Sequence, residues 1–378
     1  MNENKRVIID YLSATFPLII SETEDEQERS FKTFRFFREF FGLHRCECRT
    51  EPFATNNFKY QFTLKEFITL RCDGPVNSNG ERTCQLELKG EGCREFERIA
   101  NGKTWLDLCK LLYGLDVTFK RIDITIDDLS GMEINSYYLY KKIKNGYYTS
   151  VFKSPAKFYG LDDKTFNIEM GSRRSPTQLV IYDKRTEQLQ KHKVCDESYW
   201  TRYEMRFRGA KADALVLELC QKYVNNDDIV YGLDIQRFAK EQLYLTLDIK
   251  EESNDDSNHK YRNDTDPKWL AFLDDSEKSE PVKVTPRETT YESRRAYSMP
   301  RAAVILATWF MMKNQDFDLY FHDLTNEMYN LLSKFSDKQK KRLNECLLEN
   351  GIEPLDEAGF DNLKMKFYEK VVDMELPF

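Results

Sequence analysis

Carboxylates and arginines share one face of a short predicted strand. In RIDITID (121–127), period-two alternation puts Arg121, Asp123 and Asp127 on one face and three isoleucines on the other. Two carboxylates on a polar strand face could hold a divalent cation through oxygen ligands. A solvated outer face is the alternative explanation of this strand by itself.

A second strand repeats the combination. In RYEMRFR (202–208), Glu204 shares a face with three arginines, Arg202, Arg206 and Arg208. One carboxylate among three guanidiniums suits a metal ligand beside a phosphate-binding array, or else a surface ladder of salt bridges. In TCQLELKG (83–90), Glu87 is a further candidate carboxylate.

Two glycine-containing turns could contact phosphate. GEGCR (90–94) places Arg94 at a predicted helix start, where backbone N–H groups favour anions. GSRR (171–174) combines a tight turn with the Ser172 hydroxyl and the guanidiniums of Arg173 and Arg174. Each turn alone is a weak signal.

Tyr182 lies on a predicted strand (177–183) that continues into Asp183 and Lys184. A tyrosine hydroxyl can attack a phosphodiester and keep the DNA end as a phosphotyrosine. Its ordinary pKa near 10 means that it needs a cation or a base. The chain has 21 tyrosines, so a structural role is the default for any one of them.

These residues must be positioned by a mixture of strands and helices. Alternating or short apolar blocks predict strands over 6–21, 57–72 and 83–90, while 93–113 has helical spacing. Further strands are expected over 117–128, near 147–153, 165–170 and 177–183, and over 200–207. This order predicts an α+β fold with a mainly antiparallel central sheet and flanking helices.

Composition divides the chain of 378 residues. It excludes disordered, collagen-like and membrane-embedded proteins, with 40% hydrophobic and 32% charged residues. We expect a catalytic domain over 1–245, an acidic flexible linker or loop over 246–292, and a helical C-terminal region over 293–378.

Net charge alone argues mildly against a nucleic-acid partner, because it is −7 for the whole chain. Residues 141–211, however, carry sixteen basic and eight acidic side chains, a local charge of +8. Aromatic residues are interleaved with them, a pattern that can follow a nucleic-acid backbone and stack unpaired bases.

An odd number of cysteines, nine, predicts reduced thiols and a cytoplasmic protein. The pair Cys46 and Cys48 after His44 could be half of a zinc site, but free thiols on a strand are favoured because no second pair has finger spacing. The longest apolar run, 302–312, has eleven residues, about half of the roughly 20 that a membrane helix needs.

Four motifs in order resemble the Rep-trans family of replication initiation factors. They are GEGCREFE (90–97), RIDITIDD (121–128), MGSRRSPTQLVIYDK (170–184) and RYEMRFRG (202–209). The opening IDYLSATF (9–16) is also similar to the start of the family. This family includes initiators of rolling-circle plasmids, related phage proteins, and relaxases of integrative conjugative elements.

The resemblance implies site-specific nicking and joining of one DNA strand at an origin through a 5′-phosphotyrosine. It makes Tyr182 the nucleophile. Asp123 and Glu204 become the best candidate metal ligands, and Asp127 and Glu87 are the next candidates. The predicted DNA or phosphate contacts are Arg94, Ser172, Arg173, Arg174, Lys184, Arg202 and Arg206.

An all-carboxylate site favours Mg²⁺ or Mn²⁺. The resemblance also implies origin DNA, single-stranded or as an extruded hairpin, as partner, together with a host helicase and no membrane. A homodimer is consistent with the family, but no interface pattern in the sequence shows one.

The chain departs from familiar patterns at two places. Glu169 and Met170 stand where family members often carry an aromatic residue before the GS turn, which removes a competing tyrosine. The four histidines form no His-hydrophobe-His motif, so HUH nucleases are excluded as a close match. Two alternatives remain: a non-catalytic origin-binding protein, and a metal-dependent nuclease that uses water.

Overall fold

The computed structural model describes residues 5–18, 25–77, 80–99, 102–130, 134–160, 166–191, 194–252, 259–274, 276, 278, 281, 302–303, 305–313 and 315–373. The chain divides into two compact units, residues 1–286 and 287–378. Among the described residues, no helix is long and apolar enough to cross a membrane.

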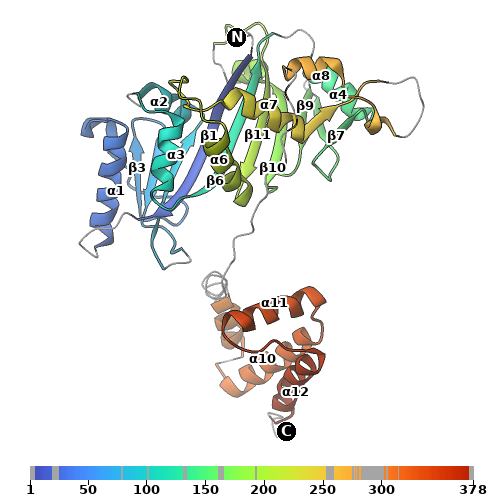
Figure 1. Ribbon diagram of the computed structural model, residues 1–378. Helices are drawn as coiled ribbons and strands as arrows, with labels where there is room; N and C mark the ends of the chain where they lie inside the picture. The colour runs from blue at the N-terminus through green and yellow to red at the C-terminus, as the bar shows by residue number, and fades with distance from the viewer. Residues whose placement is uncertain are drawn as a thin grey trace. The chain divides into compact units, whose positions relative to one another are not determined.

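The first unit is built on a ten-stranded sheet (Figure 1). Its order is β2-β3-β4-β5-β1-β6-β11-β10-β9-β8, and every neighbouring pair is antiparallel. The strands are β1 (Lys5–Pro17), β2 (Cys48–Thr50), β3 (Tyr60–Leu64), β4 (Ile68–Cys72), β5 (Thr83–Lys89), β6 (Thr118–Asp128), β8 (Lys157–Gly160), β9 (Phe166–Met170), β10 (Thr177–Asp183) and β11 (Thr201–Arg208). The predicted α+β fold with a mainly antiparallel sheet is confirmed.

Helices cover one face of this sheet. They are α1 (Glu26–Phe40), α2 (Glu91–Ile99), α3 (Trp105–Tyr113), α4 (Ser136–Lys144), α6 (Ala210–Lys222) and α7 (Ile235–Thr246), while the short α5 (Lys184–Gln190) follows β10. Helix α6 packs on β6 and β11, and α7 packs on β1 and β6. Buried side chains such as Leu215 of α6 and Phe238 of α7 join Ile124 and Met205 of the strands in one core.

Period-two alternation therefore sends apolar side chains to the helices and polar ones to the opposite face. Ile122, Ile124 and Ile126 are buried on the helix side, as the sequence predicted. The polar residues between them point to the other face. A one-residue slip of any central strand would exchange the two sets.

This alternation is interrupted in β6, where the register against β1 shifts between Phe119 and Arg121, and in β1. In β1 the register against β6 shifts between Ile9 and Tyr11, so Asp10 has no partner on β6. Side chains of the hydrophobic core are odd-numbered before this bulge, at Val7 and Ile9, and even-numbered after it, at Leu12, Ala14 and Phe16.

The expected acidic linker over 246–292 is wrong for its first part. Residues Leu247–Ile249 form β12, which pairs with β7 (Tyr148–Ser150), and α8 (Pro267–Phe272) follows. Trp269 of α8 is fully buried in the core of the first unit. Burial of these few large apolar side chains outweighs the acidic composition that suggested a mobile segment. Residues 282–301 lie outside the described residues.

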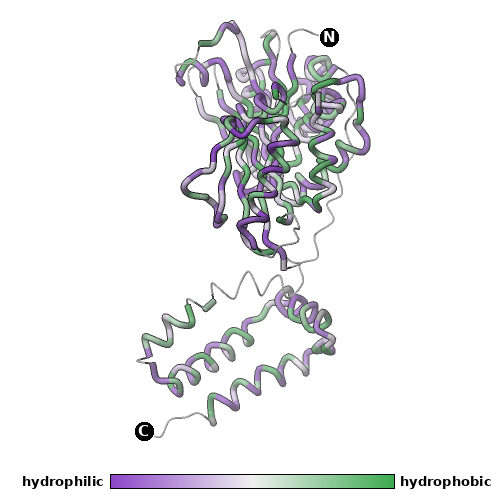
Figure 2. Tube along the Cα trace, turned by 90° about the vertical axis from the view of Figure 1, so that its left-hand side faces the viewer, coloured by the Kyte–Doolittle hydropathy of each residue, from purple (hydrophilic) through white to green (hydrophobic). Residues whose placement is uncertain are grey.

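The second unit contains helices only among its described residues. They are a helix over 305–312, α10 (Phe317–Leu332), α11 (Asp337–Glu349) and α12 (Glu357–Asp373), and α10 packs against α12. Hydrophobic and hydrophilic segments alternate along them in Figure 2, as in amphipathic helices.

Candidate active site

The polar face of the sheet carries a row of side chains that runs across four strands. Tyr182 of β10 is paired with Arg202 of β11, which is paired with Asp127 of β6, and Asp127 is paired with Arg6 of β1. In the same strand order, Val180, Glu204, Thr125 and Ile8 form the next row on this face. The row after it consists of Gln178, Arg206, Asp123 and Tyr11. The strand register thus places Glu204 diagonally next to both Tyr182 and Asp123.

Asp127 is already fully engaged by guanidinium groups. Arg202 donates two hydrogen bonds to its carboxylate, Nε to Oδ1 at 2.7 Å and Nη2 to Oδ2 at 2.9 Å. Arg6 adds a third from Nη2 at 3.0 Å. The side chains of Arg202 and Asp127 are 4% and 0% exposed. This geometry makes Asp127 a structural partner of the arginines.

The other two central carboxylates are each held by an arginine of the same strand. Arg206 donates to Glu204 through Nε at 2.7 Å and Nη2 at 2.9 Å. Arg121 donates to Asp123 through Nε at 2.8 Å and Nη2 at 2.5 Å. Residues i and i+2 of a strand point to one face, so each pair closes within its own strand.

The two carboxylates differ in proton affinity. Burial raises the pKa of Asp123 to about 6, against the opposing hydrogen bond from Arg121. Burial also opposes ionisation of Glu204, but the hydrogen bond and charge of Arg206 lower its pKa below the usual value. Both carboxylates are therefore mainly ionised at neutral pH, and Asp123 takes up a proton before Glu204 as the pH falls.

Asp10 is a site residue that sequence reasoning missed. Its carboxylate lies 3.1 Å from the Nη1 atom of Arg202, on the polar face. Burial raises its pKa, and the charge of Glu204 raises it further. The motif IDYLSATF contains Asp10, but the bulge hides its orientation from any period-two analysis.

Glu87 lies apart from this centre. It is on β5, and β1 separates β5 from β6 in the sheet. Tyr11 donates a hydrogen bond to it, and Arg71 lies 3.0 Å away. The structure therefore does not bring Glu87 together with Asp123 and Glu204.

Tyr182 stands at the end of β10, where the chain turns into α5. Asp183 caps that helix by accepting a hydrogen bond from the backbone N–H of Thr186 at 2.8 Å, which fixes the end of the strand. The Nζ atom of Lys184 lies 5.6 Å from the centre of the Tyr182 ring. Burial raises the pKa of Tyr182, and the negative charge of Glu204 adds to this effect.

The predicted phosphate contacts fall into two groups. Arg94 donates to the carbonyl of Ile9 at 2.6 Å and pairs with Glu97, and Lys184 pairs with Glu187 at 2.6 Å. The turn residues Ser172, Arg173 and Arg174 are exposed. Neither Arg173 nor Arg174 has an ion pair within the part of the chain that the structure describes, so both guanidiniums are available to a ligand.

The carboxylates of this face could supply part of the ligands of a hard divalent cation. No group of three or more His, Cys, Asp or Glu residues is arranged around a metal position among the described residues. Mg²⁺, however, is commonly bound by one or two carboxylates, waters and substrate phosphates. Glu204 with Asp123, or with Asp10, offers such a carboxylate pair. The cysteines are free thiols, and Cys46 with Cys48 belongs to no metal cluster in the described chain.

Comparisons with known proteins agree on one class. The sequence profile described as "Replication initiation factor" matches residues 117–325, more than half of the chain. The chain is 25% identical over 292 residues to "Putative DNA relaxase NicK" of Bacillus subtilis (strain 168), covering 74% of this chain and 75% of that protein. The structure of a rolling circle replication initiator protein from Geobacillus stearothermophilus has the same fold, with a TM-score of 0.56 and 21% identity, covering 74% of this chain and 98% of the other.

Proposed function

Because the chain belongs to the replication initiation factor family, we propose that it nicks and rejoins one DNA strand at an origin through a covalent 5′-phosphotyrosine. Nicking would start rolling-circle replication of a plasmid, phage or integrative conjugative element, or its conjugative transfer. One observation carries the proposal. A tyrosine stands at a strand end, in one row with Arg202 and diagonal to Glu204.

Tyr182 is the nucleophile in this proposal. Its hydroxyl oxygen forms a bond to the scissile phosphorus while the bond from phosphorus to the 3′ oxygen breaks. The 5′ phosphate stays on the tyrosine, and the 3′ oxygen takes up a proton and leaves as a free hydroxyl. Attack by a DNA 3′ hydroxyl on the phosphotyrosine reverses these steps and rejoins the strand.

Proton removal from Tyr182 is the difficult part of this chemistry, because its raised pKa keeps the phenol protonated at neutral pH. The charges of Glu204, Glu187 and Asp10 act on Tyr182. Glu187 is held by Lys184 and Lys191, so we assign the role of proton acceptor to Glu204 and Asp10. Arg202, which faces Tyr182 across the strand pair, stabilises the charge that develops on the phosphoryl oxygens.

A divalent cation is implied by the resemblance to this family. Glu204, together with Asp123 or Asp10, would hold it. When bound, Mg²⁺ or Mn²⁺ supplies Lewis-acid polarisation of the phosphoryl group. Asp127 and Glu87 are less suited, because the first is held by Arg202 and Arg6 and the second lies on β5.

The test is a search for the covalent adduct. The protein is incubated with a labelled single-stranded origin oligonucleotide and Mg²⁺ or Mn²⁺, and the products are separated on a denaturing gel. Tyr182→Phe should abolish the adduct. Tyr11→Phe is the matched control, because Tyr11 is a second tyrosine on the same face and should not be needed.

Each outcome separates the candidate functions. An adduct that persists in Tyr182→Phe refutes the assignment of the nucleophile. Cleavage without any adduct supports a nuclease that activates water. Binding with neither product supports a non-catalytic origin-binding protein. Peptide mapping of the adduct by mass spectrometry identifies the modified tyrosine directly.

A further inference from the structure

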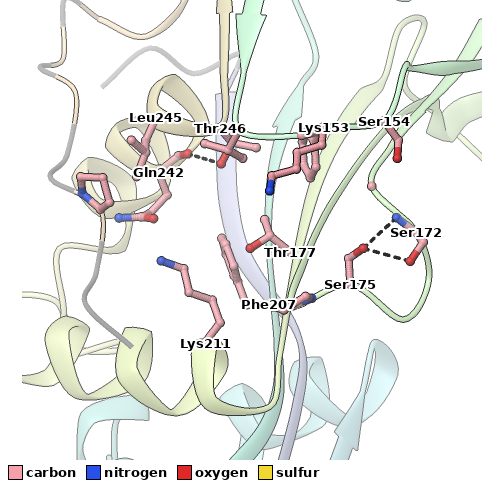
Figure 3. A pocket seen from close by; sticks show the side chains of 15 residues that line it. Lys153, Ser154, Ser172, Ser175, Thr177, Phe207, Lys211, Gln242, Leu245 and Thr246 are labelled. Atoms are coloured by element: carbon pink, nitrogen blue, oxygen red, sulfur yellow. Dashed lines mark hydrogen bonds between the residues drawn. The ribbon is translucent and has the colours of Figure 1, made fainter. Parts of the chain in front are cut away.

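A cavity of about 510 Å³ lies on the helix-covered side of the sheet, away from the proposed nicking site (Figure 3). Residues 151–154 after β7, the turn 171–177, Lys211 of α6 and the end of α7 line it. Its size is within the range of small-molecule sites, about 300–1,000 Å³. Thr177 and Tyr182 are at opposite ends of β10, so roughly 17 Å of strand separates the two places.

Two ammonium groups give the cavity its charge. The side chains of Lys153 and Lys211 both point into it in Figure 3. Neither forms an ion pair with any residue that the structure describes. Burial lowers the pKa of Lys211 although the more distant charge of Glu218 opposes the shift, which reflects the cost of a half-buried cation without an ion-pair partner among the described residues. An anionic ligand between the two lysines would remove that cost.

The remaining walls combine hydroxyl groups with aromatic rings. Thr177 offers a hydroxyl between the two lysines in Figure 3, Ser154 offers one at the edge near Ser172, and Phe152 and Phe207 contribute rings. Hydroxyls and ammonium groups are common phosphate contacts in protein–nucleic-acid complexes. Aromatic side chains provide surfaces on which bases stack regardless of sequence.

A glycine allows the close packing of this wall. Gly171 has a φ of +81°, and a Cβ there would lie 2.7 Å from the carbonyl oxygen of Thr177 and 2.8 Å from the ring of Phe152. Only glycine adopts this conformation and also leaves room for both neighbours. The GS turn therefore shapes the cavity as well as exposing Arg173 and Arg174.

We propose that this cavity binds a phosphate-bearing nucleotide, with the phosphate between Lys153 and Lys211 and the base against the aromatic wall. The ligand is either a nucleotide of single-stranded DNA or a free nucleotide. The site is distinct from Tyr182 and does not depend on the nicking reaction.

The experiment measures binding in a Tyr182→Phe background, which removes the proposed nucleophile. The probes are deoxythymidine monophosphate, inorganic phosphate and a short oligothymidylate, titrated by calorimetry. Lys211→Gln should weaken nucleotide binding by about tenfold or more, the loss of one charge-assisted contact. Lys222→Gln is the matched control, because Lys222 is on the same helix, outside the cavity, and pairs with Glu218.

Three results decide the proposal. Weaker monophosphate binding in Lys211→Gln, but not in Lys222→Gln, identifies a free-nucleotide site. The same difference for the oligonucleotide alone identifies a DNA-strand site. Equal binding by both variants for every probe overturns the proposal. Lys211→Arg, which keeps the charge, should retain most of the affinity.

Folding and nicking are checked separately. The Lys211→Gln variant should have an unfolding temperature equal to or above that of the parent protein, because it removes a half-buried cation that has no ion-pair partner among the described residues. A loss of binding can then not be assigned to misfolding. The adduct assay is run with Tyr182 intact. A protein that binds nucleotides at this cavity but forms no adduct contradicts only the proposed nicking function.

Discussion

Replacing Arg202 by methionine should destabilise the first unit strongly. The Asp127 side chain is fully buried and receives two of its hydrogen bonds from Arg202. Removing one partner of a buried ion pair costs about 3–5 kcal/mol, because the remaining charge is left without compensation. Arg6 stays at 3.0 Å from Asp127 and keeps part of the compensation, so we expect the lower end of that range; the compensation is incomplete because the Arg6 side chain is 48% exposed. The unfolding temperature should fall by on the order of 10 °C.

The assay is urea unfolding followed by tryptophan fluorescence. Three of the four tryptophans, at 105, 200 and 269, are in the first unit, so the signal mainly reports on it. Arg208→Met is the control on the same strand and face, because the Arg208 side chain hydrogen-bonds, among the described residues, the carbonyl of Ser175 and the amide oxygen of Gln178 but no carboxylate. Adding Asp127→Asn to Arg202→Met should recover part of the loss, since a neutral amide costs less to bury.

The reasoning fails if Arg202→Met costs less than about 1 kcal/mol, or no more than Arg208→Met. Asp127 would then tolerate the loss of its guanidinium partner. It would return as a candidate metal ligand equal to Glu204, and the distinction between structural and reactive carboxylates on this face would be lost.

Three further outcomes are expected. The raised pKa of Tyr182 keeps the phenol protonated at neutral pH, so its proton must pass to the ionised form of Glu204 or Asp10; single-turnover adduct formation should rise in the acidic range as these carboxylates ionise and level off above about pH 7, and a rate that keeps rising about tenfold per unit to about pH 9 argues that hydroxide removes the proton. Asp10→Asn should slow adduct formation by about 100-fold yet change unfolding free energy by less than about 1 kcal/mol, and an unchanged rate rules out its role as base. Gly171→Ala should lower thermal stability more than Gly146→Ala, because both have a φ near +80° but an added Cβ meets neighbours only at Gly171; equal losses would leave only the backbone strain.

Strand periodicity predicted which side chains share a face. The alternation in 121–127 and 202–208 separated Asp123 and Glu204 from the isoleucines and from Met205 correctly, because a pleated strand has a fixed period of two. The resemblance to the family supplied the order of motifs and hence Tyr182.

Register and bulges could not be predicted in the same way. Nothing in RYEMRFR indicates that Arg202 faces Asp127 on β6 while Arg206 folds back on Glu204 of its own strand. Such pairings depend on how neighbouring strands align, which turns and core packing set over long sequence distances. Composition also misled over 247–273, where Trp269 is buried together with the acidic residues Asp248 and Asp266.

The bulge in β1 has a consequence for how the site and the fold depend on each other. Without Asp10, the residues from Val7 to Phe16 would alternate regularly, with Ile9, then Tyr11, then Leu12 in phase with β6. Asp10 is thus an extra residue that the pairing of β1 with β6 does not require. Its backbone carbonyl instead accepts a hydrogen bond at 2.8 Å from the N–H of Gly90, the residue after β5. A carboxylate carried on such a spacer can be gained or lost by a one-residue insertion or deletion, while every core side chain of the strand keeps its neighbours.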